Sequence, residues 1–263
     1  MRKSLKIDSV EASISFSTDI LDIYNLMRSS YPARFIPEYQ VREEKKGGSS
    51  VYKVEYLRGK PELTFEEKTK KMKICVDKYS YGETSFLLLQ LLEREWEENN
   101  LYCVHAACVA YDGEGILIVG EGGTGKTSLA LDLYKKGFDF LSNEHTVIDP
   151  NDNLICGGTK VATVKQYCLD KVEKLREKLI EFPTDDNLTL FLLDLRESPK
   201  VAREADISLI VRPIVLPVKK KYAKMSPLSE FYVRDSFLEF SSSLIRGSYV
   251  YLNKFSFLGI DLD

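Results

Sequence analysis

The stretch Ile-Leu-Ile-Val-Gly-Glu-Gly-Gly-Thr-Gly-Lys-Thr occupies residues 116–127 and decides the fold. Its four apolar residues, 116–119, predict a buried strand, and residues 128–135 predict a helix with an apolar face. Between them, Gly120, Gly125 and Lys126-Thr127 fit the pattern G-x-x-x-x-G-K-[ST] of a phosphate-binding loop. The loop therefore has the strand before it and the helix after it that the motif requires. This context predicts an α/β fold organised around a nucleotide site.

The chemistry of such a loop comes from its backbone and from two side chains. Backbone N–H groups surround polyphosphate oxygens, and the helix N-terminus adds the positive end of its dipole. Lys126 is expected to reach the β- and γ-phosphates, and the Thr127 hydroxyl is expected to hold Mg²⁺. The predicted cofactors are therefore ATP and Mg²⁺. The residues predicted to bind the nucleotide are Gly120, Glu121, Gly122, Gly123, Thr124, Gly125, Lys126, Thr127 and Ser128.

Composition limits the classes of protein that fit. The 263 residues are 44% hydrophobic, which gives room for one large domain or two modest ones and excludes global disorder. The net charge of −3 excludes a globally basic nucleic-acid-binding protein but not a local basic patch. The five cysteines form no C-x-x-C pair, so reduced thiols are expected rather than a zinc site. No signal-like or membrane-spanning stretch is evident, and we expect a cytoplasmic protein without a membrane partner.

The chain divides into two predicted domains. Residues 1–83 contain alternating runs at 10–16 and 51–57 and are predicted to form a smaller β-rich domain that binds the acceptor or a partner. Residues 84–263, which contain the phosphate-binding loop, are predicted to form a kinase domain. Basic and aromatic residues alternate within the first part: Arg34, Tyr39, Arg42, Lys45, Lys46, Tyr52, Lys53, Tyr56 and Arg58. They fit a nucleic-acid or partner surface, but the outer face of a half-solvated sheet carries the same residues and is the favoured interpretation.

Further elements frame the loop. Helices are predicted from Thr84 or Ser85 to Asn99 and, with amphipathic spacing, over 166–180. Strands are predicted over 102–111, 138–141, 146–148, 188–195 and 207–218. A basic run, Lys219 to Lys221 with Lys224, follows the last strand and is either a phosphate contact or a solvated loop.

Three side chains outside the loop are candidates for catalysis. Asn143 and Glu144 follow the strand 138–141, where a second metal ligand or a base is expected; Glu144 is predicted to bind the metal or to act as base. His105 opens the strand before the loop strand, and its imidazole fits either charge stabilisation or proton acceptance. A carboxylate in a solvated loop and a histidine in the core are the structural alternatives. The predicted catalytic set is His105, Lys126, Asn143 and Glu144.

Together, these residues resemble the C-terminal catalytic domain of HPr kinase/phosphorylase and its kinase relatives. The resemblance covers about residues 84–245 and rests on a strand opening with His105, a glycine turn, the loop to Thr127, and Ala130-Leu-Asp-Leu with Lys136-Gly. It implies the phosphoenolpyruvate-carboxykinase-like nucleotide fold and, by analogy, a homo-oligomer. Relatives in thermophilic archaea include a kinase that phosphorylates a tRNA ribose hydroxyl.

The chain also departs from that family. The family carries two adjacent aspartates where this chain has Asn143-Glu144, and the family signature Glu-Ile-Arg-Gly-Leu-Gly is replaced by Cys156-Gly-Gly-Thr-Lys160. The resemblance therefore does not predict HPr as the acceptor, nor the reverse phosphorolysis.

Three functions remain open from the sequence. The first, marginally favoured, is an Mg²⁺-dependent kinase that transfers the γ-phosphate of ATP to an RNA, at a tRNA ribose 2′-hydroxyl. The second is a protein or peptide serine kinase. The third is a nucleotide-binding regulator without transfer activity, for which the Asn143-Glu144 departure is the main support.

Overall fold

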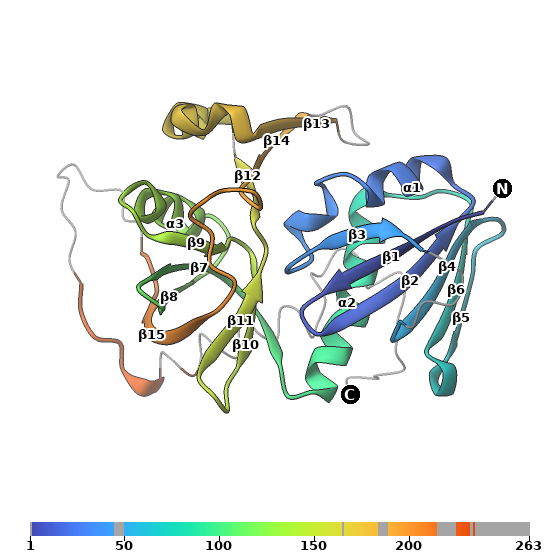
Figure 1. Cartoon of the computed structure of the whole chain (residues 1–263), viewed down its shortest axis with the longest axis horizontal. Helices are drawn as coiled ribbons and strands as arrows, with labels where there is room; N and C mark the ends of the chain where they lie inside the picture. Colours follow the sequence, from blue (N-terminus) through green and yellow to red (C-terminus); the bar gives the residue numbers. More distant parts are fainter. Residues whose placement is uncertain are drawn as a thin grey trace.

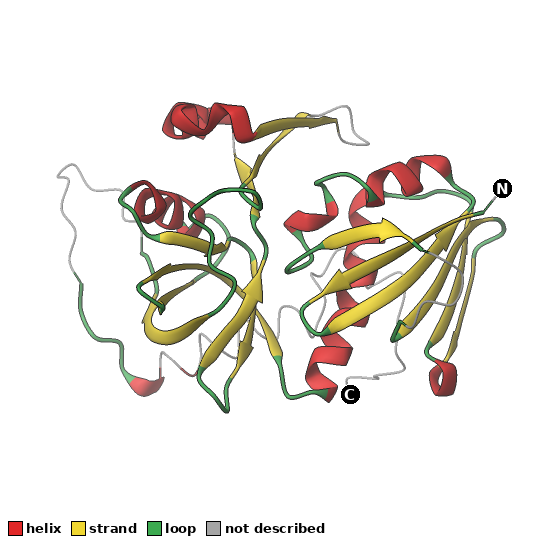
Figure 2. Cartoon of the chain, viewed as in Figure 1, coloured by secondary structure: helices red, strands yellow, loops and turns green. Residues whose placement is uncertain are grey.

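The fold is taken from a computed structural model that describes residues 2–44, 50–164, 166–183, 189–214, 225–231 and 234. These residues form three sheets with helices packed on them (Figures 1 and 2). The α/β class predicted from the sequence is confirmed. In the described part of the chain, no helix has both the length and the apolar character needed to cross a membrane. The basic run at 219–224, with Lys45 and Lys46, lies outside the described residues.

A six-stranded sheet forms the N-terminal part, in the order β3-β1-β2-β4-β6-β5. Its strands are β1 (Lys3–Ser9), β2 (Ala12–Thr18), β3 (Gln40–Glu43), β4 (Tyr52–Arg58), β5 (Glu62–Glu66) and β6 (Lys71–Val76). Its helices are α1 (Leu21–Met27) and the short 3₁₀ segments η1 (Pro32–Arg34) and η2 (Glu67–Thr69). Alternate residues of β2 are buried, as the period-2 pattern predicted, so one face of the sheet carries the core. The β-rich character predicted for this part is confirmed.

The long helix α2 (Tyr81–Glu98) covers the apolar face of that sheet (Figure 1). It begins earlier than the predicted Thr84 or Ser85, because the Ser80 hydroxyl already caps the helix by accepting a hydrogen bond from the Glu83 backbone. Trp96 is buried and donates its indole N–H to the Val10 carbonyl at 2.6 Å. Thus α2 shares a hydrophobic core with the N-terminal sheet. The domain boundary between residues 83 and 84 stays a prediction.

The second sheet closes on itself around the phosphate-loop strand. Its strands are β7 (Tyr102–Tyr111), β8 (Glu114–Val119), β9 (Asp139–Ser142), β10 (His145–Asp149), β11 (Leu154–Gly158) and β15 (Ala205–Val211). Pairing runs from β7 through β8, β15, β11 and β10 and returns to β7, and only β8 with β15 is parallel. Val104, Ala106 and Cys108 of β7 join the core inside this ring, whereas Ala107 and Val109 pack toward α3 (Lys126–Lys135) outside it.

The third sheet is small and antiparallel, with β14 (Thr189–Asp194) between β12 (Val161–Val164) and β13 (Leu179–Pro183). The amphipathic helix predicted over 166–180 is present in part: its last two residues belong to β13, and the remainder is not a regular α-helix. It is the 3₁₀ segment η3 (Gln166–Lys178), with non-helical backbone at Val172 and Leu175. Its apolar residues Leu169, Val172 and Leu175 recur every three residues, which suits the 3₁₀ period and lets them pack together against the α3 core.

Candidate functional site

The phosphate-binding loop connects β8 to α3 as predicted. Gly120, Gly123 and Gly125 have φ of +150°, +86° and +93°, values that side chains with a Cβ rarely adopt. A Cβ on Gly120 would lie 2.8 Å from the Thr124 hydroxyl oxygen, so the position also lacks space for one. The Thr124 hydroxyl donates to the Glu121 carbonyl at 2.8 Å and braces the loop from within.

Lys126 holds its ammonium group inside the loop. The side chain is buried, and Nζ donates to the carbonyl oxygens of Gly120 and Glu121, the latter at 3.0 Å. Burial lowers the pKa of Lys126, while the nearby carboxylates of Glu144 and Glu121 act in the opposite direction. A polyphosphate placed in the loop would offer this ammonium stronger, charged acceptors than the two carbonyls.

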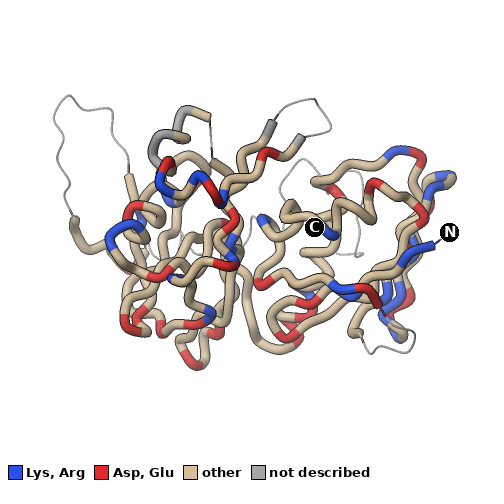
Figure 3. The backbone as a smooth tube through the Cα atoms, turned by 45° about the horizontal axis from the view of Figure 1, so that its top comes forward, with Lys and Arg blue, Asp and Glu red and all other residues tan. Residues whose placement is uncertain are grey.

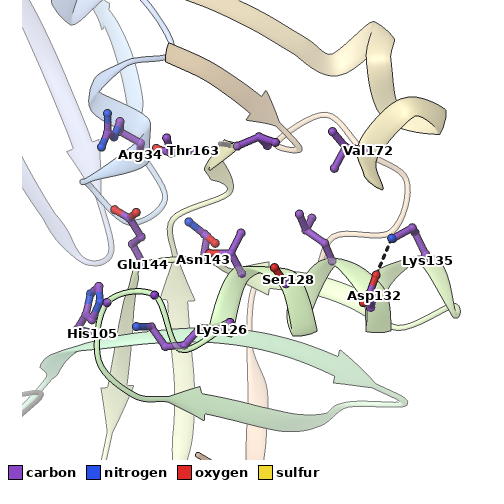
Figure 4. A pocket seen from close by; sticks show the side chains of 16 residues that line it. Arg34, His105, Lys126, Ser128, Asp132, Lys135, Asn143, Glu144, Thr163 and Val172 are labelled. Carbon is purple, nitrogen blue, oxygen red and sulfur yellow. Dashed lines mark hydrogen bonds and ion pairs between the residues drawn. The ribbon is translucent and has the colours of Figure 1, made fainter. Parts of the chain in front are cut away.

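A cavity of about 340 Å³ opens at the N-terminus of α3. Figure 4 shows the loop and α3 along one side, with Glu144 and Arg34 facing them. The residues lining it are Arg34, His105, Gly122, Gly123, Gly125, Lys126, Thr127, Ser128, Leu131, Asp132, Lys135, Asn143, Glu144, Thr163, Val164 and Val172. All four predicted catalytic residues thus share one cavity. Of the predicted nucleotide-binding residues, Gly120, Glu121 and Thr124 do not line it.

The carboxylate of Glu144 projects into the cavity from the turn between β9 and β10 (Figure 4). The turn is fixed by the buried Thr159, whose hydroxyl oxygen accepts the backbone N–H groups of Glu144 at 3.0 Å and His145 at 3.2 Å. Burial raises the pKa of Glu144, and the positive charges of Arg34 and Lys126 oppose that rise. The carboxylate therefore sits between two cations contributed by distant parts of the chain.

The two histidines of the chain lie opposite each other on paired strands. His105 of β7 faces His145 of β10, and their ring centroids are 6.0 Å apart in an edge-to-face arrangement. Burial, together with the charge of Lys126, lowers the pKa of His105 to about 4, although a hydrogen bond with the Glu144 backbone opposes this. His105 is consequently neutral at pH 7 and has the protonation state of a proton acceptor.

Unpartnered polar atoms surround the cavity. Among the described residues, Asn143 Oδ1, Thr163 Oγ1 and Arg34 Nε are buried without a hydrogen-bond partner, and all three residues line the cavity. Buried polar atoms in folded proteins are normally paired. Their grouping around one cavity therefore indicates a polar ligand.

The oxygens available to a metal ion come from separate elements. In the part of the chain that the structure describes, no three His, Cys, Asp or Glu residues are grouped as metal ligands. Thr127, Asn143 and Glu144 nevertheless line the same cavity, and their side chains carry a hydroxyl, an amide and a carboxylate. Oxygens of these kinds are the hard ligands that Mg²⁺ prefers. The donor set fits Mg²⁺, and the assignment of Thr127 and Glu144 as metal ligands stays a prediction.

Sequence reasoning missed part of this site. From the sequence, Arg34 was named only as one of the interleaved basic residues of the N-terminal part. In the structure it lines the cavity. Thr163, Val164 and Val172 were not singled out, since no local motif marks them. Asp132 and Lys135 also line the cavity and form an ion pair of 2.6 Å on α3; their spacing of three residues on the predicted loop helix was the available signal.

A comparison with curated proteins found a short match to the family that the sequence resembles. The chain is 27% identical to the HPr kinase/phosphorylase of Prosthecochloris aestuarii over 90 residues, which are 34% of this chain and 26% of that protein. The match thus spans about a quarter of the length of the curated relative. A solved structure, the Hpr(Ser) kinase/phosphatase of Coxiella burnetii, matches 48% of this chain and 73% of its own, with 19% identity and a TM-score of 0.28. No family model matches the chain.

Proposed function

We propose that the chain is an ATP-dependent phosphotransferase that moves the γ-phosphate to a hydroxyl group, with a protein side chain as the acceptor. One observation carries the proposal: a single cavity joins a phosphate-binding loop to a carboxylate and a neutral imidazole. A kinase needs a phosphate cradle, charge neutralisation and a group that orients or deprotonates the acceptor hydroxyl. Similarity to a protein whose name describes a kinase supports the same reaction class.

Each residue has a defined part in this reaction. The loop N–H groups and Lys126 bind the β- and γ-phosphate oxygens and neutralise charge as it develops there. The acceptor hydroxyl gives its proton to Glu144 or His105, its oxygen bonds to the γ-phosphorus, and the bond from that phosphorus to the ADP oxygen breaks. Thr127, Asn143 and Glu144 would hold Mg²⁺, which supplies further charge neutralisation at the phosphates when bound.

A protein acceptor is supported better than the RNA acceptor that the sequence marginally favoured. Base stacking needs exposed rings, but Tyr39, Tyr52 and Tyr56 of the interleaved set are buried in the N-terminal core. Figure 3 shows basic and acidic residues interspersed along the N-terminal strands, and ion pairs join Arg42 with Asp8 and Arg2 with Glu55. Among the residues that the structure describes, this surface therefore carries mixed charge rather than the one-sign stripe expected of an RNA contact.

The curated relative is named for action on HPr, and two departures argue against HPr itself. Asn143 stands where a carboxylate is expected, and the segment 156–160 lacks the signature of that family. A serine on another protein is therefore the proposed acceptor.

The test is transfer of label from γ-³²P-ATP in the presence of Mg²⁺, with a protein fraction and total tRNA offered separately. Label in protease-sensitive material is expected, and Lys126→Ala should abolish it. Label confined to nuclease-sensitive material would replace the protein acceptor by RNA. Nucleotide binding without transfer to either would favour the regulator.

The base is identified with two single variants. Glu144→Gln keeps the shape of the side chain and should reduce turnover about a hundredfold, the range expected for loss of a general base. His105→Ala should reduce turnover to a similar extent if the imidazole accepts the proton of the acceptor hydroxyl. A variant that turns over at a near-normal rate removes its residue from the mechanism.

A further inference from the structure

Arg34 is a charged residue of the cavity to which the proposed function gives no role. It ends the 3₁₀ segment η1 of the N-terminal part, about 90 positions before the phosphate-binding loop. Figure 4 shows it on the far side of Glu144 from Lys126, so that the carboxylate lies between the two cations. Its Nε atom is buried without a hydrogen-bond partner among the described residues. This buried N–H donor is therefore available to an acceptor that enters the cavity.

The segment that carries Arg34 is fastened to the phosphate-loop half on both sides. Before it, the Ser30 hydroxyl donates to Asp194 at 2.7 Å and accepts from Arg196 at 2.9 Å. After it, Glu38 forms a partly buried ion pair with Lys160, and the Glu38 backbone N–H donates to the Gly158 carbonyl at 3.1 Å. These contacts fix residues 30–38 against the part of the chain that contains the turn with Glu144.

Three further contacts hold Arg34 and its neighbour Phe35 in place. His145, which follows Glu144, makes a hydrogen bond with the backbone of Phe35, the neighbour of Arg34. The guanidinium carbon lies 4.4 Å from the centre of the Phe35 ring and 5.3 Å from that of Tyr31. Stacking on two rings restricts the arginine before any ligand arrives, so less entropy is lost when it binds one.

We propose that Arg34 contacts the terminal phosphate of the bound nucleotide, so that the N-terminal part of the chain completes the site built on the phosphate-binding loop. The inference rests on the proposed function for the presence of ATP. Arginine suits this task because its planar fork matches phosphate oxygens and stays charged. The loop and Lys126 reach the β-phosphate, which ADP and ATP share, so a contact from Arg34 to the γ-phosphate alone would distinguish a triphosphate from a diphosphate.

The competing explanation is that Arg34 only neutralises Glu144. Arg34 does lower the pKa of that carboxyl. A purely neutralising arginine would, however, affect ADP and ATP binding alike, because Glu144 is present with both. Discrimination between the two nucleotides therefore separates the explanations.

The experiment measures the affinity of the full chain for ADP and for AMP-PNP, a non-hydrolysable ATP analogue, by calorimetry with Mg²⁺. Arg34→Met is the main variant, because its unbranched side chain keeps the packing over Phe35 while removing the charge. Arg34→Lys retains the charge without the fork. Arg42→Ala is the matched control, since Arg42 also belongs to the N-terminal part but is exposed and pairs with Asp8.

Arg34→Met should weaken AMP-PNP binding about 10- to 100-fold, the range for one charge-assisted hydrogen-bonded contact, and change ADP binding less than about threefold. Arg34→Lys should recover part of the loss, and Arg42→Ala should match the wild type. Guanidinium ion at about 20 mM should restore AMP-PNP binding to Arg34→Ala and not to Lys126→Ala. An equal loss for both nucleotides, or no loss, overturns the inference.

Failure of the proposed function gives a different pattern. If Arg34→Met selectively loses AMP-PNP while the wild type transfers phosphate to no acceptor, the inference stands and the kinase proposal fails. If the wild type binds neither nucleotide, both fail. Circular dichroism of each variant shows whether the fold is kept, and Arg34→Lys carries the test if Arg34→Met unfolds.

Discussion

Replacing Gly158 with alanine tests whether two strands of the site are as tightly juxtaposed as the structure shows. Gly158 ends β11, beside the turn that presents Asn143 and Glu144. A Cβ at this position would lie 2.1 Å from Ser142 Cβ, 3.1 Å from Ser142 Cα and 3.2 Å from the His145 carbonyl oxygen. Non-bonded carbons settle at roughly 3.5 Å or more, so the two strands would have to separate by roughly 1.4 Å.

The magnitude follows from the atoms involved. Overpacking a core costs about 1–3 kcal/mol and sometimes more. Every contact of the new Cβ is with backbone or with a Cβ, so no side-chain rotation relieves it, and we expect about 3 kcal/mol. At about 2–4 °C per kcal/mol for a chain of this size class, Tm should fall by about 6–12 °C. ATP affinity should also fall, because Ser142 immediately precedes Asn143.

The assay is thermal unfolding of the wild type, Gly158→Ala and Gly82→Ala under identical conditions, with nucleotide titration of each. Gly82 lies in the first turn of α2, where a Cβ would meet its neighbours at 3.7 Å or more. Alanine there should be neutral or stabilise by up to about 1 kcal/mol through helix propensity. If the free energy of unfolding of Gly158→Ala lies within about 0.5 kcal/mol of that of the wild type, and the variant binds ATP normally, the close packing of these strands is refuted.

Two further predictions concern buried polar groups. Burial lowers the pKa of His145 to about 3 from its ordinary 6.5, so between these two pH values the unfolded chain binds a proton that the folded chain does not. The free energy of unfolding therefore decreases by about 1.4 kcal/mol for each unit by which the pH is lowered. His145→Gln should therefore flatten this fall between pH 6 and 4 in urea titrations, and an unchanged slope would contradict the assignment. The Tyr52 hydroxyl is buried without a partner among the described residues, whereas that of Tyr39 donates to the Met27 carbonyl. Tyr52→Phe should therefore leave the free energy of unfolding unchanged or raise it, whereas Tyr39→Phe should lower it by about 1 kcal/mol. A larger loss for Tyr52→Phe than for Tyr39→Phe would contradict this assignment of hydrogen bonds.

The parts of the site that the sequence predicted are the parts encoded locally. The loop glycines, Lys126 and the following helix lie within one short stretch, and their φ values follow from the motif itself. The strand 102–111 was predicted with its observed bounds, because apolar residues and a glycine turn delimit it. Asn143 and Glu144 were predicted from their place at the end of a strand next to the loop. Short-range patterns were sufficient in each case.

The sequence was ambiguous where one pattern serves two structures. The apolar residues Leu169, Val172, Leu175 and Leu179 are three or four positions apart, a spacing that suits an amphipathic α-helix as well as the 3₁₀ segment η3. Likewise, tyrosines alternating with lysines suit either an aromatic binding surface or a two-faced sheet. Alternation alone does not say which face of the sheet is covered. The face with the tyrosines is covered by α2, which begins nearly thirty residues after Tyr52.

Arg34 shows why the remainder of the site lay beyond sequence reasoning. Its position depends on Ser30 meeting Asp194, on Phe35 meeting His145 and on Glu38 meeting Lys160. Each of these pairs joins residues more than one hundred positions apart, and no periodicity within either segment encodes the partner. The same contacts carry a functional consequence, because a site that needs two distant segments forms only when both halves of the chain have folded against each other. Phosphate chemistry at the loop is thereby tied to the integrity of the N-terminal part, which a phosphate-binding loop alone would not require.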